Sequence, residues 1–146
     1  MVTYADTSAL YAWLDVSARA HEPVRHALED ALQHSLVVTS NYVLAELVAV
    51  AQRRLGMEPT RQFLDEFAPE LVVHWVDEDL HQSGVAAMLT AGRRDLSLVD
   101  CTSFEIMRRR GIRRVFTLDR HFAEQGFECL PGITPGNDRG TSDRDG

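Results

Sequence analysis

The chain has 146 residues, of which 45% are hydrophobic and 25% are charged, and its formal net charge is −7. This length suits one domain with a real hydrophobic core and is short for two. No apolar stretch approaches the roughly 18 residues of a membrane span, and the first residues lack the basic start and apolar stretch of a secretion signal. We therefore expect a single cytoplasmic domain without a membrane segment.

The cysteines and histidines lack the spacing of a zinc site or a disulfide framework. Cys101 and Cys129 are the only cysteines, and neither has a close cysteine or histidine at metal-ligand spacing. The six histidines are scattered along the chain. We expect packed thiols and solvated or structural histidines.

The basic residues, all of them arginines, are unevenly distributed. The negative net charge argues against general coating of nucleic acids. Residues 91–120 nevertheless contain eight arginines and four acids, a local balance of +4. Arginines 108–110 and 113 could simply complement the negative end of a helix dipole, while the others could contact phosphate groups.

Apolar periodicity predicts strands that alternate with helices. Residues 2–5 are β-prone and lead through Asp6 into a helix over 8–14. A polar amphipathic helix over 20–34 precedes a strand at 36–40, after which Ser40 and Asn41 are N-cap candidates for a helix to about Arg54. The remaining elements are a helix from Pro59 to about Phe67, a strand at 71–76, helices at 77–91 and 97–110, a strand at 114–118, a short helix at 122–125 and a strand at 127–130.

This alternation predicts a three-layer α/β/α fold with a central, mostly parallel, five-stranded sheet. The folded domain should cover residues 1–131. Residues 132–146 contain too little apolar surface to form a core, so we expect this tail to be disordered.

Four carboxylates lie inside or at the end of strongly apolar runs, where an unpaired charge is costly: Asp6, Glu46, Asp100 and Asp119. The three aspartates have local explanations. Asp6 could cap the helix that follows it, Asp100 has capping-box spacing from Ser97, and Asp119 could form an Asx-turn. Glu46 has none, because it interrupts an apolar helix and no basic residue lies within a turn of it.

The four acids also have one joint explanation. Ligands bind parallel sheets beyond the carboxyl ends of the strands, at the point where the strand order reverses. If the first and fourth strands are neighbours, Asp6 and Asp119 converge there, Asp100 can face them and Glu46 can close the ring. Mutual repulsion would raise some of their pKa values unless a divalent cation were present. Oxygen ligands without histidine or thiolate favour Mg²⁺ or Mn²⁺.

Four segments resemble the acidic motifs of PIN-domain ribonucleases: DTSAL at 6–10, AEL at 45–47, SLVDCTSF at 97–104 and FTLDRHF at 116–122. The length of the chain and the order of these motifs resemble those of the VapC toxins of bacterial toxin–antitoxin pairs. The resemblance covers residues 2 to about 131. The resemblance implies a metal-dependent endoribonuclease whose catalytic and metal-site acids are Asp6, Glu46, Asp100 and Asp119. Ser8 and Thr117 would be supporting hydroxyls.

The resemblance also implies partners. VapC-like proteins form homodimers and are silenced by a small antitoxin that lies across the active-site groove. Arg120, Arg93 and Arg94 are candidates for contact with RNA phosphates, and single-stranded or loop RNA is the expected substrate. A partner-binding surface or ordinary core would each explain the apolar helix residues Leu10, Tyr11, Trp13, Leu14, Val43, Leu47 and Val50.

Other phosphate-handling α/β proteins fit less well. A phosphatase of the haloacid dehalogenase type would need a second aspartate where Ser8 stands, and a response-regulator receiver would need a lysine, which this chain lacks. The glycine-rich motifs of nucleotide-binding modules are also absent. The main non-enzymatic alternative is a catalytically silent PIN-like module that binds RNA or protein.

Overall fold

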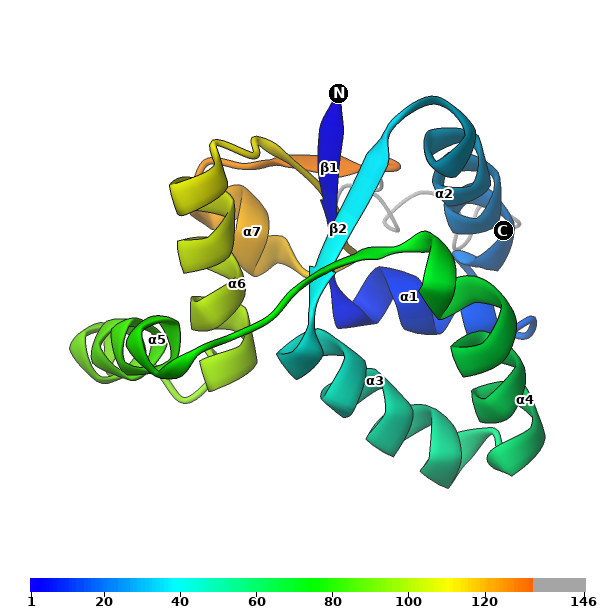
Figure 1. Ribbon diagram of the computed structural model, residues 1–146, viewed down its shortest axis with the longest axis horizontal. Helices are drawn as coiled ribbons and strands as arrows, with labels where there is room; N and C mark the ends of the chain where they lie inside the picture. The colour runs from blue at the N-terminus through cyan, green and yellow to red at the C-terminus, as the bar shows by residue number, and fades with distance from the viewer. Residues whose placement is uncertain (133–146) are drawn as a thin grey trace, which may run out of the picture.

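The computed structural model describes residues 1–132, and a parallel β-sheet lies at its centre (Figure 1). Within this range the sheet has five strands: β1 (Val2–Ala5), β2 (Leu36–Ser40), β3 (Val72–His74), β4 (Arg114–Phe116) and β5 (Glu128–Leu130). Their order is β3-β2-β1-β4-β5, and each neighbouring pair is parallel. The sequence predicted a mostly parallel sheet, and over the described residues it is wholly parallel.

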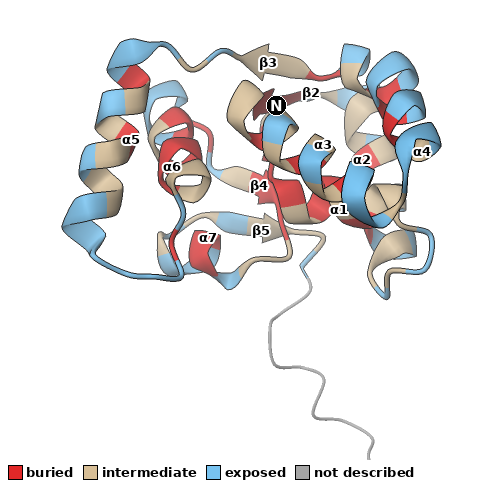
Figure 2. Cartoon of the chain, turned by 90° about the horizontal axis from the view of Figure 1, so that it is seen from below, coloured by how far each residue is buried: buried red, intermediate tan, exposed pale blue. Residues whose placement is uncertain are grey.

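Helices lie on both sides of this sheet, which confirms the predicted three-layer α/β/α architecture (Figure 2). One side carries α1 (Thr7–Leu14), α2 (His21–His34), α3 (Asn41–Arg54) and α4 (Met57–Gln62), and the other carries α5 (Glu78–Ala91), α6 (Leu98–Arg110) and α7 (Arg120–Glu124). In residues 1–132 no helix is both long and apolar enough to cross a membrane.

Local signals in the sequence set several helix ends. The Ser40 hydroxyl accepts a hydrogen bond from the Val43 amide at 3.1 Å and so caps α3. Gly111 ends α6 in the left-handed conformation, with φ of 66°, where a residue with a Cβ would be strained. These ends were predictable because each depends on residues within one turn of the helix.

Other boundaries differ from the prediction. The helix expected to reach Phe67 ends at Gln62 and continues as a π-helical turn, Phe63–Phe67, and a 3₁₀ turn, Ala68–Glu70. Phe63 and Phe67 are both buried, and their stacked rings have centroids 5.5 Å apart.

The strands predicted at 71–76 and 114–118 are each three residues long, because side chains bind the amides that would extend them. The Val76 amide donates to Asn41 Oδ1 at 2.7 Å, and the Leu118 amide donates to Ser8 Oγ at 2.9 Å.

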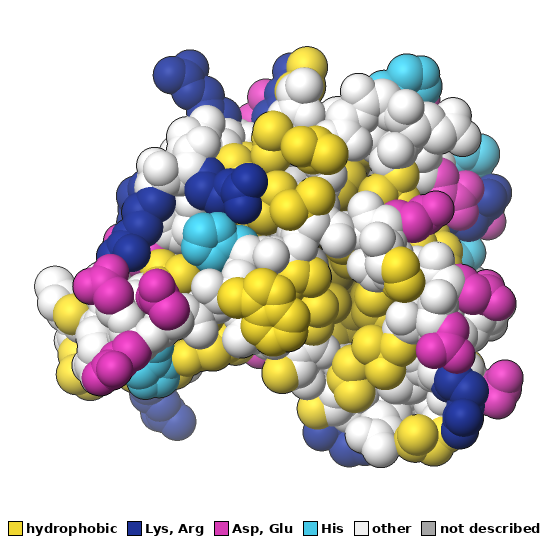
Figure 3. Space-filling view, viewed as in Figure 1, with side chains coloured by type: hydrophobic (Ala, Val, Ile, Leu, Met, Phe, Trp, Pro, Cys, Tyr) yellow, Lys and Arg dark blue, Asp and Glu magenta, His cyan; other side chains and the backbone are white. Residues whose placement is uncertain are grey.

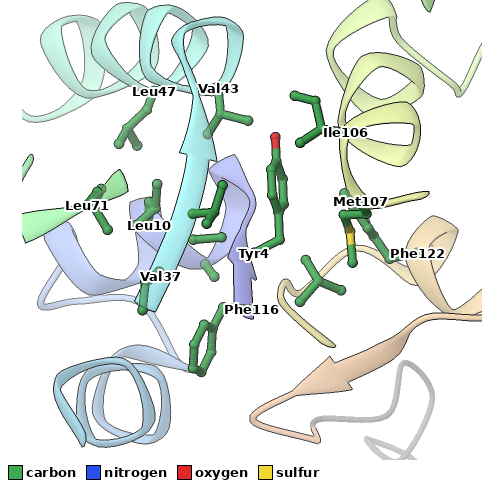
Figure 4. Close-up of a cluster of buried hydrophobic side chains, with 14 of the residues drawn as sticks. Tyr4, Leu10, Val37, Val43, Leu47, Leu71, Ile106, Met107, Phe116 and Phe122 are labelled. Atoms are coloured by element: carbon green, nitrogen blue, oxygen red, sulfur yellow. The ribbon is translucent and has the colours of Figure 1, made fainter. Parts of the chain in front are cut away.

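The core is centred on Tyr4, which is fully buried and points between Val43 and Ile106 (Figure 4). A buried phenol needs a polar partner, and the Tyr4 hydroxyl forms a 2.8 Å hydrogen bond with Ser103 Oγ. Of the apolar helix residues singled out above, three are core: Leu10, Val43 and Leu47. The others are half-buried: Tyr11, Trp13, Leu14 and Val50.

Both cysteines are free thiols, Cys101 buried and Cys129 half-buried, as predicted. The predicted disorder of residues 132–146 falls, apart from Gly132, outside the described part of the chain.

Candidate active site

The strand order reverses between β1 and β4, as the sequence argument required. From β1 the chain builds outward to β2 and β3, and then crosses to β4 and β5 on the other side. Ala5 is in register with Phe116, and the Asp6 amide donates to the Phe116 carbonyl at 3.0 Å. Asp6 and Asp119 therefore follow adjacent strands at the carboxyl edge of the sheet.

Asp6 occupies the N-cap position of α1, but its side chain makes no capping hydrogen bond, so the helix-capping explanation for this residue is wrong. The residue is only 2% exposed. Its Oδ2 atom accepts hydrogen bonds from Ser8 Oγ and Thr117 Oγ1, both at 3.2 Å. The two hydroxyls predicted to support the site thus contact the same carboxylate oxygen.

The protons of these two hydroxyls are directed by the backbone that follows β4. Ser8 Oγ accepts from the Leu118 amide and Thr117 Oγ1 accepts from the Asp119 amide, each at 2.9 Å. A hydroxyl has one proton to donate, and the two hydroxyl oxygens also lie 3.2 Å from each other. Either both protons go to Asp6 Oδ2, or one hydroxyl donates to the other and that one donates to Asp6. Asp6 Oδ1 is buried and has no hydrogen-bond partner among the described residues. A buried carboxylate oxygen of this kind calls for a cation or a proton.

The four acids are electrostatically coupled. Burial raises the pKa of Asp6 to about 7, and the charges of Asp100 and Asp119 contribute to the increase. Burial also raises the pKa of Asp100, with the charges of Asp119 and Glu46 acting in the same direction. The predicted repulsion within the group is therefore present.

The local explanations for Asp100 and Asp119 are correct, but they use one oxygen of each. Ser97 and Asp100 form the reciprocal capping box, with two hydrogen bonds of 3.1 Å, one of them to Asp100 Oδ2. Asp119 Oδ1 accepts from the His121 amide at 2.9 Å. A carboxylate has two oxygens, so helix capping and ligand binding are compatible at both residues.

Glu46 reaches the site from α3 and is half-buried. Within residues 1–132 its carboxylate accepts no hydrogen bond and forms no ion pair. One turn earlier, the Tyr42 hydroxyl is hydrogen-bonded to His81 Nδ1 of α5, which fixes the start of α3. Glu46 is thus positioned by its helix, while its own carboxylate is unrestrained.

The donor chemistry fits a hard divalent cation, because all of the acids offer carboxylate oxygens and Asp6 Oδ1 lacks a partner. Among the described residues, however, no three Asp, Glu, His or Cys side chains are grouped tightly enough to hold a metal ion as they lie. The shared metal site therefore stays a prediction. Carboxylates repel one another, and a shared cation would offset that repulsion.

The three arginines proposed to contact phosphate differ in their surroundings. The Arg93 guanidinium donates to both carboxylate oxygens of Asp95, at 3.0 and 2.8 Å, and to Glu124 at 3.1 Å. Arg120 is largely exposed, with its Nε atom 3.7 Å from Glu124, and Arg94 is exposed. Arginines 108–110 lie in the last turn of α6, as the helix-dipole explanation predicted.

His121 is a feature that the sequence argument missed. It was grouped with the solvated or structural histidines, and it is of the structural kind, because it is buried and its ring lies among three acids. Nε2 is 3.6 Å from Asp95 and 3.7 Å from Asp119, and Nδ1 is 3.3 Å from Glu124. Its place two residues after Asp119 was the available signal.

Comparison with known proteins agrees with this architecture. The PIN domain family matches residues 3–128 of the chain. The 23S rRNA-specific endonuclease VapC20 of Mycobacterium tuberculosis is 31% identical over 93 residues, which span 63% of this chain and 71% of that protein.

Solved structures show the same fold. The crystal structure of M. tuberculosis VapC20, a sarcin-ricin loop cleaving toxin, has a TM-score of 0.78 at 26% identity and covers 86% of this chain and 95% of its own. VapBC2 from Rickettsia felis, bound to a promoter DNA fragment, has a TM-score of 0.67 at 14% identity, over 88% and 97% of the two chains. At that identity the likeness shows the fold alone. Together with the four acids at the carboxyl edge of the sheet, these matches establish that the chain belongs to the PIN-domain family, among its VapC-like ribonuclease toxins.

Proposed function

We propose that the chain is a Mg²⁺- or Mn²⁺-dependent endoribonuclease, the toxin of a VapBC-type pair, with Asp6, Glu46, Asp100 and Asp119 as its catalytic site. The observation that carries this proposal is the buried Asp6 Oδ1 atom, which has no protein partner within residues 1–132 although Oδ2 of the same carboxylate has two. The pKa of about 7 for Asp6 supports it, because a nearby cation would favour the charged form that burial disfavours.

In this mechanism Asp6, Asp100 and Asp119 would hold one ion. When bound, the ion would acidify a water molecule and stabilise the charge that develops on the phosphate. Ser8 and Thr117 keep Asp6 oriented by donating to Oδ2. Glu46, free of hydrogen bonds within the described chain, would orient the attacking water or help to hold a second ion. By resemblance, the products carry a 5′-phosphate and a 3′-hydroxyl.

The substrate of this reaction would be single-stranded or loop RNA, since VapC20 is specific for 23S rRNA and cleaves the sarcin-ricin loop. Arg94 and Arg120 are exposed, and they are better candidates for phosphate contact than Arg93. Such contacts would position the RNA without reading its sequence. Arg93 is a weaker candidate, because two acids already bind its guanidinium.

The proposed partners are an antitoxin and a second copy of the chain, in the cytoplasm. β3 is an edge strand without a charged residue or proline, and Trp75, directly after it, is 71% exposed. Apolar side chains gather at the centre of the molecular face on which β3 lies (Figure 3). An exposed tryptophan among apolar side chains favours association with protein, and the acids at 77–79 disfavour RNA there. Light scattering should show a dimer that Trp75→Ala weakens.

The nuclease proposal is tested by incubating a structured RNA with the protein in Mg²⁺ or Mn²⁺, in EDTA, and with Asp6→Ala. We expect cutting only by the unmodified chain with metal. Equal cutting in all three conditions would remove the metal-nuclease claim. Tight RNA binding without cutting under any of them would favour the catalytically silent module.

A further inference from the structure

Four polar side chains form one connected cluster beside the proposed site: Arg93, Asp95, His121 and Glu124. Arg93 binds both oxygens of Asp95 and also Glu124, through hydrogen bonds of 2.8 to 3.1 Å. The His121 ring lies between the same two acids, with Nδ1 3.3 Å from Glu124 and Nε2 3.6 Å from Asp95. We call this cluster the Arg93 bridge. It connects residues that are up to 31 positions apart in the sequence.

The Arg93 bridge joins the two segments that carry Asp100 and Asp119. On one side, Asp95 stands two residues before Ser97, whose capping box with Asp100 begins α6. On the other side, Glu124 and His121 belong to α7, which begins after Asp119. The same two helices are also in apolar contact, because the Phe104 and Phe122 rings meet edge to face with centroids 4.9 Å apart.

His121 extends the bridge to the Asp119 carboxylate itself. Its backbone amide donates to Asp119 Oδ1 at 2.9 Å, and its ring Nε2 lies 3.7 Å from the same atom. The ring is nearly inaccessible to solvent, with 9% of the side chain exposed. A buried ring held against three carboxylates leaves Asp119 little freedom to turn away from Asp100.

We propose that the Arg93 bridge is a positioning device that fixes the separation of Asp100 and Asp119, and that Arg93 serves the metal site rather than an RNA phosphate. This inference rests on the proposed function. Carboxylates that must share one cation repel each other in its absence, so bracing the segments that carry them lowers the cost of binding the ion. Arg93 can brace both segments because its planar guanidinium donates in two directions at once.

The exposure of the bridge makes the inference testable. The side chains of Arg93, Asp95 and Glu124 are 42, 45 and 40% exposed, and ion pairs at such positions contribute little to global stability. Arg93→Ala should therefore fold and melt like the unmodified chain. An effect on metal binding would then reflect position and not unfolding.

The experiment measures Mn²⁺ affinity without RNA, from the Mn²⁺-dependent rise in melting temperature, and then kcat and KM for cleavage. Arg93→Ala should bind Mn²⁺ about tenfold more weakly, as for other residues that orient metal ligands. At limiting Mn²⁺ its kcat should fall while KM for RNA stays constant. Arg93→Lys should recover part of the affinity, because an ammonium can pair with one acid but cannot span both.

The matched control is Arg113→Ala, which removes the same charge from an exposed arginine between α6 and β4. Arg113 lies at the amino ends of the strands, opposite to the proposed site. It should leave Mn²⁺ affinity unchanged. The double variant Arg93→Ala/Glu124→Gln should bind Mn²⁺ no more weakly than Arg93→Ala, because both changes break one bridge. Additive losses would contradict the bridge.

Two further outcomes would overturn the inference. Arg93→Ala could bind Mn²⁺ as tightly as Arg113→Ala does, or it could raise KM and reduce the salt dependence of RNA binding, as loss of a phosphate contact would. Asp119→Ala distinguishes failure of the bridge from failure of the proposed metal site. If Asp119→Ala loses Mn²⁺ binding and Arg93→Ala keeps it, only the bridge fails. If Asp119→Ala also keeps it, the proposed metal site fails as well.

Discussion

Asp6 and Glu46 belong to one proposed site but are held in opposite ways. Asp6 is 2% exposed, follows a central strand, and has one oxygen bound by two hydroxyls whose own positions are set by backbone amides. Glu46 is half-buried on α3 and makes no hydrogen bond within residues 1–132. In the proposed mechanism the two residues would therefore have different roles. The rigid, desolvated Asp6 carboxylate would hold an ion, and the longer Glu46 side chain would orient the attacking water.

The largest expected difference between the two residues is in how they affect the pH dependence of the free energy of unfolding. The pKa of Asp6 is about 7 in the folded chain against an ordinary 3.8, so between these values the folded state binds one more proton than the unfolded state. The stabilisation that protonated Asp6 contributes is therefore fully present below pH 3.8 and is lost as the pH rises through about 7. The loss amounts to roughly 4 kcal/mol in the free energy of unfolding.

Asp6→Asn removes this loss, because the amide is neutral at every pH. In EDTA its melting temperature should exceed that of the unmodified chain at about pH 8, and the difference should shrink toward pH 4. Glu46→Gln, at a half-exposed position, should change the melting temperature little at either pH. Thermal melts across this range check both expectations. A constant offset between Asp6→Asn and the unmodified chain at all pH values would contradict the buried, protonated Asp6.

The next effect is stabilisation by metal. At about one hundred times its dissociation constant, a bound divalent ion should add about 2.7 kcal/mol to the free energy of unfolding. Addition of Mn²⁺ should therefore raise the melting temperature of the unmodified chain, and EDTA should reverse the rise. Asp6→Asn should lose the response, whereas Glu46→Gln should keep most of it and lose cleavage. Equal responses in the two variants would show that Asp6 and Glu46 share one role.

The smallest effect concerns the hydroxyl support of Asp6. Thr117→Val keeps the shape of the side chain but removes one donor to Asp6 Oδ2 and the acceptor of the Asp119 amide. A hydrogen bond of this kind contributes about 1 kcal/mol, so Mn²⁺ affinity should fall roughly fivefold. Titration of the melting temperature with Mn²⁺ measures it.

Thr60→Val is the matched control, since it removes a buried hydroxyl that donates to the Gly56 carbonyl on the distant α4. Its Mn²⁺ affinity should equal that of the unmodified chain. If the two variants lose affinity equally, the hydroxyl at position 117 has no specific role.

Much of the site geometry was predictable from the strand ends. Asp6 and Asp119 each follow an apolar run, and parallel strands bring their carboxyl ends to one edge, so the adjacency of the two acids followed once β1 and β4 paired. Ser8 and Thr117 were found through the resemblance of their motifs. That the four acids share one cation stays a prediction, because within residues 1–132 no three such side chains are grouped as a metal site.

The role of Arg93 could not be deduced in the same way. Its hydrogen bond to Glu124 spans 31 residues and depends on how α7 packs against the segment before α6. A count of charges along the sequence registers an arginine surplus, but it does not reveal which guanidinium groups are already bound by acids. His121 was missed for the same reason, since its burial is produced by elements that are distant in sequence.

By itself the sequence determined the alternation of strands and helices and the caps at Ser40, Ser97 and Gly111, and it singled out the four acids as a candidate site. These features depend on periodicity and on contacts within a few residues, which are written directly in the chain. Only the tertiary structure decided which oxygen of Asp6 lacks a partner, which acids surround His121, and which acids bind Arg93. Those properties arise from burial and from pairing across the sheet, where distant segments meet and water is excluded.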